Sequence, residues 1–99
     1  MIDSFYMNGD FWKVRFVNPK NRILVDRTGT LTVGVTNPVD RTVYLSNALL
    51  GNFLTRVTLH ELAHAMMISY GYLEQIHLYC KRRYWIDMEE LIANLIADR

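Results

Sequence analysis

The segment FLTRVTLHELAHAMMISY, from Phe53 to Tyr70, is rich in apolar residues and contains neither proline nor glycine. Its apolar side chains fall on more than one side of a helix, which is typical of a buried central helix rather than a surface helix. Gly71 follows directly, at the position where a left-handed residue commonly ends a helix. The sequence therefore predicts a buried helix over residues 53–70, with His60-Glu61-Leu62-Ala63-His64 in its middle.

The two histidines of this pentapeptide have the spacing of a metal site. Side chains four residues apart on a helix stand one above the other, so the imidazoles of His60 and His64 can bind one tetrahedral Zn²⁺. Glu61 points about 100° away from His60, beside the metal, where it can take a proton from water. We therefore expect His60 and His64 to be zinc ligands and Glu61 to be the catalytic base, in the H-E-x-x-H arrangement of zinc peptidases.

An ordinary structural explanation of the same residues also exists. Two of the three histidines of the chain lie in this pentapeptide, and they could be core residues hydrogen-bonded to the backbone or to Glu61. Two imidazoles and a carboxylate are unfavourable inside an apolar helix unless all of them are satisfied together. A metal ion satisfies them at once, which favours the zinc site.

A catalytic zinc needs a third protein ligand and an open fourth position. The candidates downstream of the pentapeptide are His77, Cys80, Asp87, Glu89 and Glu90. A second helix is expected over residues 87–97 with Asp87 as its N-cap, and Glu90 and Asn94 would share one face of it. Asn94 could then accept a hydrogen bond from a ligating histidine. Glu90 also fits a capping box with Asp87, and the apolar stripe lies nearer to Glu89, so spacing alone leaves Glu89 and Glu90 open as the third ligand.

The residues before the helix have the pattern of β-strands. Asn8-Gly9 separates two runs rich in aromatic and β-branched residues, at 5–7 and 11–17, and predicts a hairpin. A short apolar strand is expected at 23–25, an alternating strand at 30–36 and a returning strand at 41–45. These elements predict a small, mainly antiparallel sheet.

Composition excludes several classes of protein. The 99 residues are 51% hydrophobic and 21% charged with a formal net charge of +1, which indicates one globular domain over residues 1–99 and gives no reason to expect a nucleic-acid or membrane partner. Cys80 is the single cysteine, so no disulfide within the chain is possible. Without a signal-peptide pattern or a long apolar run, we expect a cytoplasmic protein.

The pentapeptide followed by Glu90-Leu91-Ile92-Ala93-Asn94 resembles the gluzincin branch of zinc metallopeptidases. The likeness covers roughly residues 32–99 and is closest to minimal gluzincins and to small phage-type and ImmA/IrrE-like peptidase domains. In that branch, a separate helix carries a Glu-x-x-x-Asp/Asn element whose first residue is the third ligand. The resemblance therefore implies that Glu90 binds the metal, that Asn94 supports it, and that the fold is α+β, a small zincin-like domain with a glutamate helix at its C-terminus.

The resemblance also implies an activity. It predicts a zinc metallopeptidase with one Zn²⁺ per chain, which hydrolyses peptide bonds in extended peptides or flexible protein segments. The strand at 41–45 would border the cleft and pair antiparallel with the substrate, although an ordinary sheet strand fits equally well. No motif selects an oxyanion donor among the candidates between the two helices, which are Tyr70, Tyr72, His77, Tyr79, Tyr84 and the Lys81-Arg82-Arg83 run. The alternative function is a zinc-binding interaction or toxin-like module with little turnover, and the intact Glu61 favours the enzyme.

Overall fold

The chain begins with a β-hairpin that turns at Asn8-Gly9. The structure, a computed structural model, describes residues 3–71, 78 and 81–97. Strand β1 (Ser4–Met7) pairs antiparallel with β2 (Asp10–Val17), and the φ angles of Asn8 and Gly9 are 48° and 82°. Asparagine and glycine are the residues that best tolerate this left-handed region, so the predicted hairpin is confirmed.

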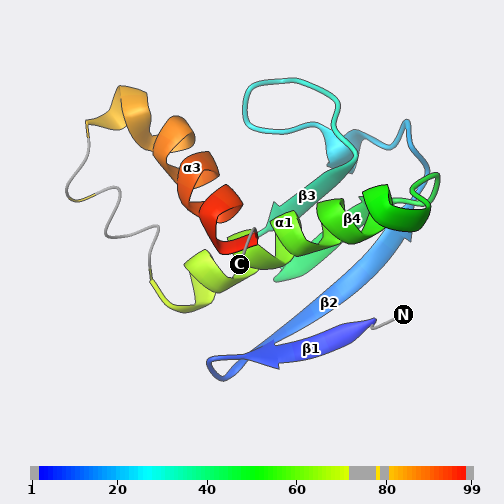
Figure 1. The fold of residues 1–99 in the computed structure, drawn as a ribbon, viewed down its shortest axis with the longest axis horizontal. Coiled ribbons are helices and arrows are strands. Elements are labelled where there is room, and N and C mark those ends of the chain that lie inside the picture. The colour runs from blue at the N-terminus through cyan, green and yellow to red at the C-terminus, as the bar shows by residue number, and fades with distance from the viewer. Residues whose placement is uncertain (1–2, 72–77, 79–80, 98–99) are drawn as a thin grey trace.

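The strands form one mixed sheet in the order β1-β2-β4-β3 (Figure 1). Strand β4 (Thr42–Ser46) pairs antiparallel with β3 (Gly34–Asn37) but parallel with β2. The expected antiparallel pairings are therefore present, and the parallel pairing is an addition that the sequence did not indicate. Because both edges of β4 are paired, the strand at 41–45 is an ordinary sheet strand, the second of the two alternatives, and it does not border a cleft as an exposed edge. The strand at this edge of the sheet, beside β4, is β3.

Residues 22–24 form a 3₁₀ turn, η1 (Arg22–Leu24), so the predicted strand at 23–25 is wrong. The side-chain oxygen of Asn21 accepts a hydrogen bond of 3.0 Å from the backbone N–H of Ile23 and stabilises this turn in place of an extended strand. Beyond η1, Thr32 N donates to Leu24 O at 2.9 Å. The alternating segment 30–36 therefore starts as part of a loop, and it becomes a regular strand only at Gly34.

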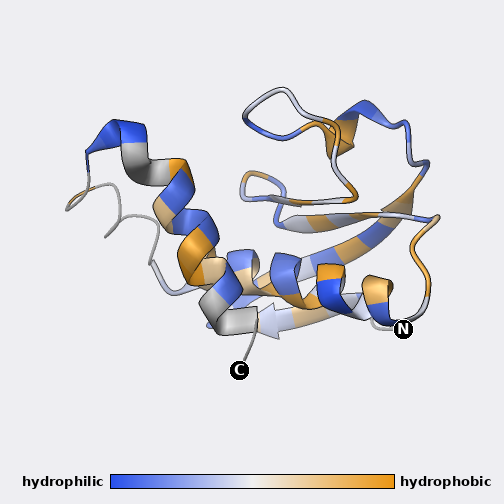
Figure 2. Cartoon of the chain, turned by 45° about the horizontal axis from the view of Figure 1, so that its top comes forward, coloured by the Kyte–Doolittle hydropathy of each residue, from blue (hydrophilic) through white to orange (hydrophobic). Residues whose placement is uncertain are grey.

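Helix α1 (Gly51–Ser69) packs on one face of the sheet and covers its core. Along β2, hydrophobic and hydrophilic residues alternate (Figure 2), and Trp12 and Val14 are the buried members of this alternation. They form one cluster with Val43 and Leu45 of β4 and with Ala65 of α1. The period-2 pattern of the sheet thus supplies the surface on which α1 lies.

The prediction for α1 holds with one restriction. Gly71 has a φ of 77°, as expected for the residue after the helix. Burial on more than one side is confined to the C-terminal half, where Ala63 and Met67 are buried, whereas Phe53 is 56% exposed in the N-terminal half. Side chains of the N-terminal half of α1 are therefore partly exposed and can line a cleft at the surface.

Helix α3 (Trp85–Ala97) follows a 3₁₀ turn, η2 (Arg82–Tyr84), and packs against α1. It starts two residues before the predicted N-cap, so Asp87 lies within the first turn and is not the cap. The capping-box interpretation of Glu90 fails for the same reason, because it requires Asp87 at the cap. The described residues thus form an α+β fold, in which no described helix has the length and hydropathy needed to span a bilayer.

Candidate metal centre

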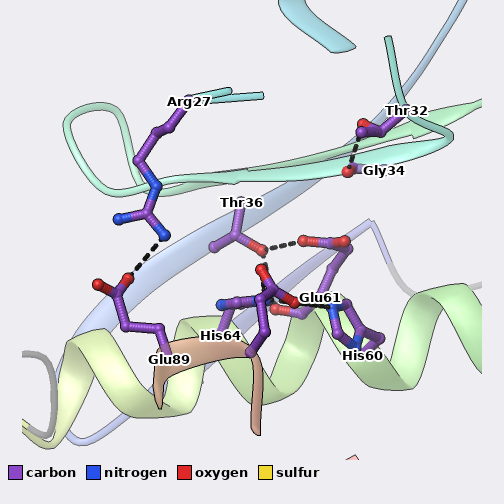
Figure 3. A network of polar contacts seen from close by, with 9 residues as sticks. Arg27, Thr32, Gly34, Thr36, His60, Glu61, His64 and Glu89 are labelled. Carbon is purple, nitrogen blue, oxygen red and sulfur yellow. Dashed lines mark hydrogen bonds and ion pairs between the residues drawn. The ribbon is translucent and has the colours of Figure 1, made fainter. Parts of the chain in front are cut away.

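His60 and His64 lie one turn apart on α1 and direct their rings into the same space (Figure 3). Their Nε2 atoms are 3.2 Å apart, and the ring centroids are separated by 4.8 Å with an interplanar angle of 75°. Their side chains are 27% and 14% exposed, so both are partly shielded from water. The structure places these two predicted ligands together, as the i, i+4 spacing requires.

Glu90 reaches the two histidines from α3. Its Oε2 lies 3.1 Å from His60 Nε2, and its Oε1 lies 3.4 Å from His64 Nε2. Tetrahedral zinc with bonds of about 2.0–2.1 Å requires ligand atoms about 3.3–3.4 Å apart. The two Nε2 atoms, 3.2 Å apart, are close to that requirement, and one ligand atom from each of the three residues lies within 4.8 Å of the others, so these residues could hold one metal ion. We call His60, His64 and Glu90 the metal cluster.

Glu89 is the neighbour of Glu90 but has a different environment. Its side chain is only 2% exposed, and its Oε1 lies 2.8 Å from Arg27 Nη2 (Figure 3). Consecutive residues of a helix point about 100° apart. With Glu89 directed to Arg27, Glu90 is the carboxylate that faces the histidines, and the structure does not bring Glu89 into the metal cluster.

The contacts within the metal cluster shift two pKa values. The hydrogen bond with Glu90 is the main cause that raises the pKa of His60 above its ordinary value of 6.5. Hydrogen bonds with His60, and then with His64, hold the pKa of Glu90 far below its ordinary value of 4.5. Both shifts have the same cause: the two imidazole nitrogens and the Glu90 carboxylate together favour a bound positive charge, either a proton or a metal ion.

Glu61 is buried between α1 and β3, next to the metal cluster. The residue is 6% exposed, and its Oε1 accepts a hydrogen bond of 2.8 Å from Thr36 Oγ1 (Figure 3). Burial raises the pKa of Glu61 above 4.5, and the opposing effects of His64, Thr36 and His60 do not cancel it. A raised pKa favours a carboxyl group that accepts a proton and later returns it.

The other candidates from the sequence are distributed as follows. Asn94 lies one turn after Glu90, and as a hydrogen-bond partner it also raises the pKa of His60. Asp87 is exposed, whereas His77 and Cys80 lie outside the described residues. Of the possible oxyanion donors, Tyr70 and the Lys81-Arg82-Arg83 run do not line the cleft described below, and Tyr72, His77, Tyr79 and the side chain of Tyr84 lie outside the described part of the structure.

A cleft of about 860 Å³ opens over the metal cluster. Its walls are α1, α3, β3 and the segment 22–27, and all three residues of the metal cluster line it together with Glu61. Access from this cleft would leave a coordination position free for a water molecule or a substrate. An open position of this kind distinguishes catalytic from structural zinc sites.

The free edge of β3 faces this cleft. Val33 O accepts a hydrogen bond of 2.9 Å from Ser46 N. In an antiparallel pair the hydrogen-bonded residues alternate, so the backbone polar groups of Gly34 and Thr36 point away from β4. The Thr32 hydroxyl donates to Gly34 O at 3.0 Å. Gly34 N–H and both backbone polar groups of Thr36 remain for a ligand, since no strand in the described part of the chain pairs with this edge.

Sequence reasoning missed three residues that shape the site: Gly34, Thr36 and Arg27. A Cβ atom on Gly34 would lie 2.9 Å from Val57 Cγ1 and 3.1 Å from Glu61 Cγ, so glycine allows β3 to approach α1 closely. The signal for Gly34 and Thr36 was present, because the alternation of residues 30–36 puts both on one small, polar face. No pattern in the sequence pointed to Arg27, since its partner Glu89 lies far along the chain.

Comparisons with known proteins identify no relative of this chain. No protein-family model matches it, and no curated protein or solved structure matches it either. The function of the site is therefore inferred from its own residues and geometry.

Proposed function

We propose that this protein is a zinc metallopeptidase of the minimal gluzincin type, which hydrolyses peptide bonds in extended peptides or flexible protein segments. One observation carries the proposal. Two imidazole nitrogens and a carboxylate converge at 3.1, 3.2 and 3.4 Å beside a buried glutamate, in an open cleft. Structural zinc sites are instead closed by four protein ligands and need no base.

The arrangement of the elements supports a zincin-like interpretation of the fold. The helix with the two histidines lies beside an edge strand, and the third ligand candidate comes from a later helix. Zinc suits this donor set, because two imidazoles and one carboxylate are typical ligands of catalytic zinc. The resemblance of the pentapeptide and of the Glu90–Asn94 element to the gluzincins also favours zinc and the gluzincin type.

Glu61 is the residue that moves protons in this proposal. When bound, zinc would supply a Lewis acid that polarises the scissile carbonyl and lowers the pKa of water. Glu61 accepts the proton of the attacking water and donates it to the leaving amine, a role that its raised pKa favours.

Thr36 can assist both protonation states of Glu61. Thr36 Oγ1 lies 2.8 Å from Glu61 Oε1 and 2.9 Å from the backbone oxygen of Glu61. While Glu61 is ionised, the Thr36 hydroxyl donates its hydrogen bond to the Glu61 carboxylate. After Glu61 gains a proton, the same hydroxyl can accept from the carboxyl group and donate to the backbone oxygen.

The substrate would bind by strand addition to β3. The outward backbone groups of Gly34 and Thr36 can pair with an extended peptide in the antiparallel direction, which is the more stable pairing. Thr36 also contacts Glu61, so a peptide on this edge would lie across the proton-transfer residue. This binding mode requires an extended segment, which explains the preference for peptides and flexible regions.

The experiment that tests the function compares wild-type protein with Glu61→Gln after both are loaded with one equivalent of zinc. We expect wild type to cleave a mixed library of unstructured peptides and Glu61→Gln to lose at least about 100-fold in rate, with zinc still bound. Asp3→Asn is the matched control, because it makes the same chemical change at an exposed carboxylate outside the cleft.

Two results would contradict the enzyme proposal. Equal cleavage by wild type and Glu61→Gln would indicate a contaminating peptidase or a different base. Stoichiometric zinc without cleavage of any peptide in the library would support the alternative, a zinc-binding interaction module with little turnover.

A further inference from the structure

The carboxylates that line the cleft are all engaged within the protein. Four acidic residues line it, and each makes a hydrogen bond or an ion pair within the protein. Asp26 accepts hydrogen bonds from Thr28 and Thr30 of its own loop, and Glu61 accepts one from Thr36. Glu89 pairs with Arg27, and Glu90 contacts the two histidines. Each of these carboxylates is thus already held by a hydrogen bond or an ion pair within the protein. The arginines of the cleft are not all held in this way.

Two arginines in the cleft have no such partner. Arg22 and Arg56 both line the cleft and are both exposed, and neither makes a hydrogen bond or ion pair through its side chain with any residue that the structure describes. The third arginine, Arg27, is held by Glu89. The first turn of α1, which precedes Arg56, contains no acidic residue. This part of the cleft therefore offers two guanidinium groups that have no partner among the described residues.

Both free arginines lie toward the same end of the cleft. Arg56 is four residues before His60 on α1, so it lies on the same face of the helix and about 6 Å nearer to its N-terminus. Arg22 is in η1, and the hydrogen bond from Thr32 N to Leu24 O keeps η1 beside the residues that lead into β3. The N-terminal ends of β3 and α1 are therefore the ends nearest to Arg22 and Arg56.

The contacts between β3 and α1 give the direction of a bound peptide. Gly34 lies against Val57 and Glu61, whereas Thr36 lies against Glu61, and Figure 1 shows that β3 runs in the same direction as α1. A peptide paired antiparallel with β3 must run in the opposite direction. The part that follows the cleaved bond would then extend toward Arg56. An extended chain rises about 3.3 Å per residue, so 6 Å corresponds to about two residues.

We propose that Arg22 and Arg56 form a subsite for an acidic side chain of the substrate, two or three residues after the cleaved bond. The ligand class is a peptide with aspartate or glutamate at that position, whose carboxylate pairs with the two guanidinium groups. The inference rests on the proposed peptidase function, and it adds a preference that the metal cluster itself does not supply.

The test uses pairs of fluorogenic peptides that differ only in glutamate or glutamine, placed either two or three residues after the cleaved bond or at the matching positions before it. For zinc-loaded wild type, we expect kcat/KM to be about three- to tenfold higher with glutamate after the bond, as one or two partly exposed ion pairs would give. Glutamate before the bond should give no such gain. The preference should also weaken as sodium chloride is raised.

Variants assign the preference to the two arginines. Arg56→Gln and Arg22→Gln should each bring the glutamate/glutamine ratio toward one, mainly through a loss of kcat/KM for the glutamate peptide. Arg15→Gln is the matched control, because Arg15 is exposed on β2 and does not line the cleft. It should keep the full preference. A ratio near one in wild type, an equal effect of Arg15→Gln, or a preference for glutamate before the bond would overturn the proposal.

Failure of the peptidase function gives a different result from failure of this subsite. If no peptide is cleaved, the proposed function is contradicted, and binding of the same labelled peptides to zinc-loaded protein, followed by fluorescence anisotropy, still tests the subsite. Tighter binding of the glutamate peptide that disappears in Arg56→Gln supports it, and equal binding of the two peptides contradicts it.

Discussion

Glu89 and Glu90 are neighbours in the sequence with opposite environments in the fold. Glu90 contacts the histidines, and Glu89 is buried against Arg27. Glu90→Gln should therefore reduce zinc affinity at least about 100-fold, because a neutral amide replaces a ligand. Glu89→Gln should reduce it less than about tenfold and instead lower the free energy of unfolding by about 1–3 kcal/mol, since the Arg27 contact loses its buried charge.

The two variants are compared by competition with a chromophoric chelator for zinc affinity, and by urea denaturation for stability. Arg27 is about half exposed, which is why the expected loss of stability lies below that for a fully buried pair. Equal losses of zinc affinity in the two variants, or a larger loss in Glu89→Gln, would show that Glu90 is not the carboxylate that binds the metal.

In the proposed site, protons and zinc would compete for His60, and this competition would determine the pH dependence of zinc binding. The pKa of His60 is raised above 6.5, so this side chain stays protonated to higher pH than an ordinary histidine. The pKa of Glu90 is lowered, so Glu90 remains ionised throughout the range above 4.5. Zinc affinity should therefore rise with pH and continue to rise above pH 6.5. Dissociation constants measured between about pH 5.5 and 8 check this, and a flat profile would contradict it.

At the level of the elements, the close approach of β3 to α1 determines where Glu61 lies. Gly34→Ala would place a Cβ atom 2.9 Å from the stiff side chain of Val57. We expect a loss of about 1–3 kcal/mol in the free energy of unfolding, together with slower peptide cleavage, because Thr36 and Glu61 are moved apart. Gly29→Ala is a control for the loss of a glycine, since nothing lies within 4 Å of a Cβ atom there. Its φ of 83° adds backbone strain but no contact with Glu61. Unchanged stability and cleavage in Gly34→Ala would show that the close approach is not needed.

Local signals predicted the elements that depend on local physics. The Asn8-Gly9 turn, the helix ending before Gly71 and the i, i+4 geometry of His60 and His64 all follow from neighbouring residues. The Asn21 side chain is equally local, but its competition with strand formation was missed, and residues 22–24 form a turn instead. The N-cap at Asp87 failed because α3 begins at Trp85.

Order in the sheet and contacts between distant segments could not be predicted in the same way. Antiparallel pairing of β3 and β4 follows from a short turn, but parallel pairing of β2 with β4 depends on where a long connection places the chain. The choice between Glu89 and Glu90 likewise depends on Arg27, which reaches α3 from the loop after η1. Such contacts carry no local signature, so the sequence left both carboxylates open.

On the scale of the whole molecule, a bound metal would link α1 to α3 through His60, His64 and Glu90. Binding to the folded state alone adds to stability, by about 2.7 kcal/mol when free zinc is 100 times its dissociation constant. For a domain of this size, removal of zinc with a chelator should lower the melting temperature by about 10 °C or more. Calorimetry with and without chelator measures the change, and Glu90→Gln should show a much smaller shift. Identical melting curves for wild type would mean that metal binding and folding are not coupled.

X-ray absorption at the zinc edge of protein loaded with one equivalent of zinc is the most direct test of the metal cluster. We predict a four-coordinate spectrum with two imidazole nitrogens and one carboxylate oxygen at about 2.0–2.2 Å. A spectrum of hydrated zinc without imidazole scattering, or protein that retains no zinc after gel filtration, would contradict a metal centre built from His60, His64 and Glu90.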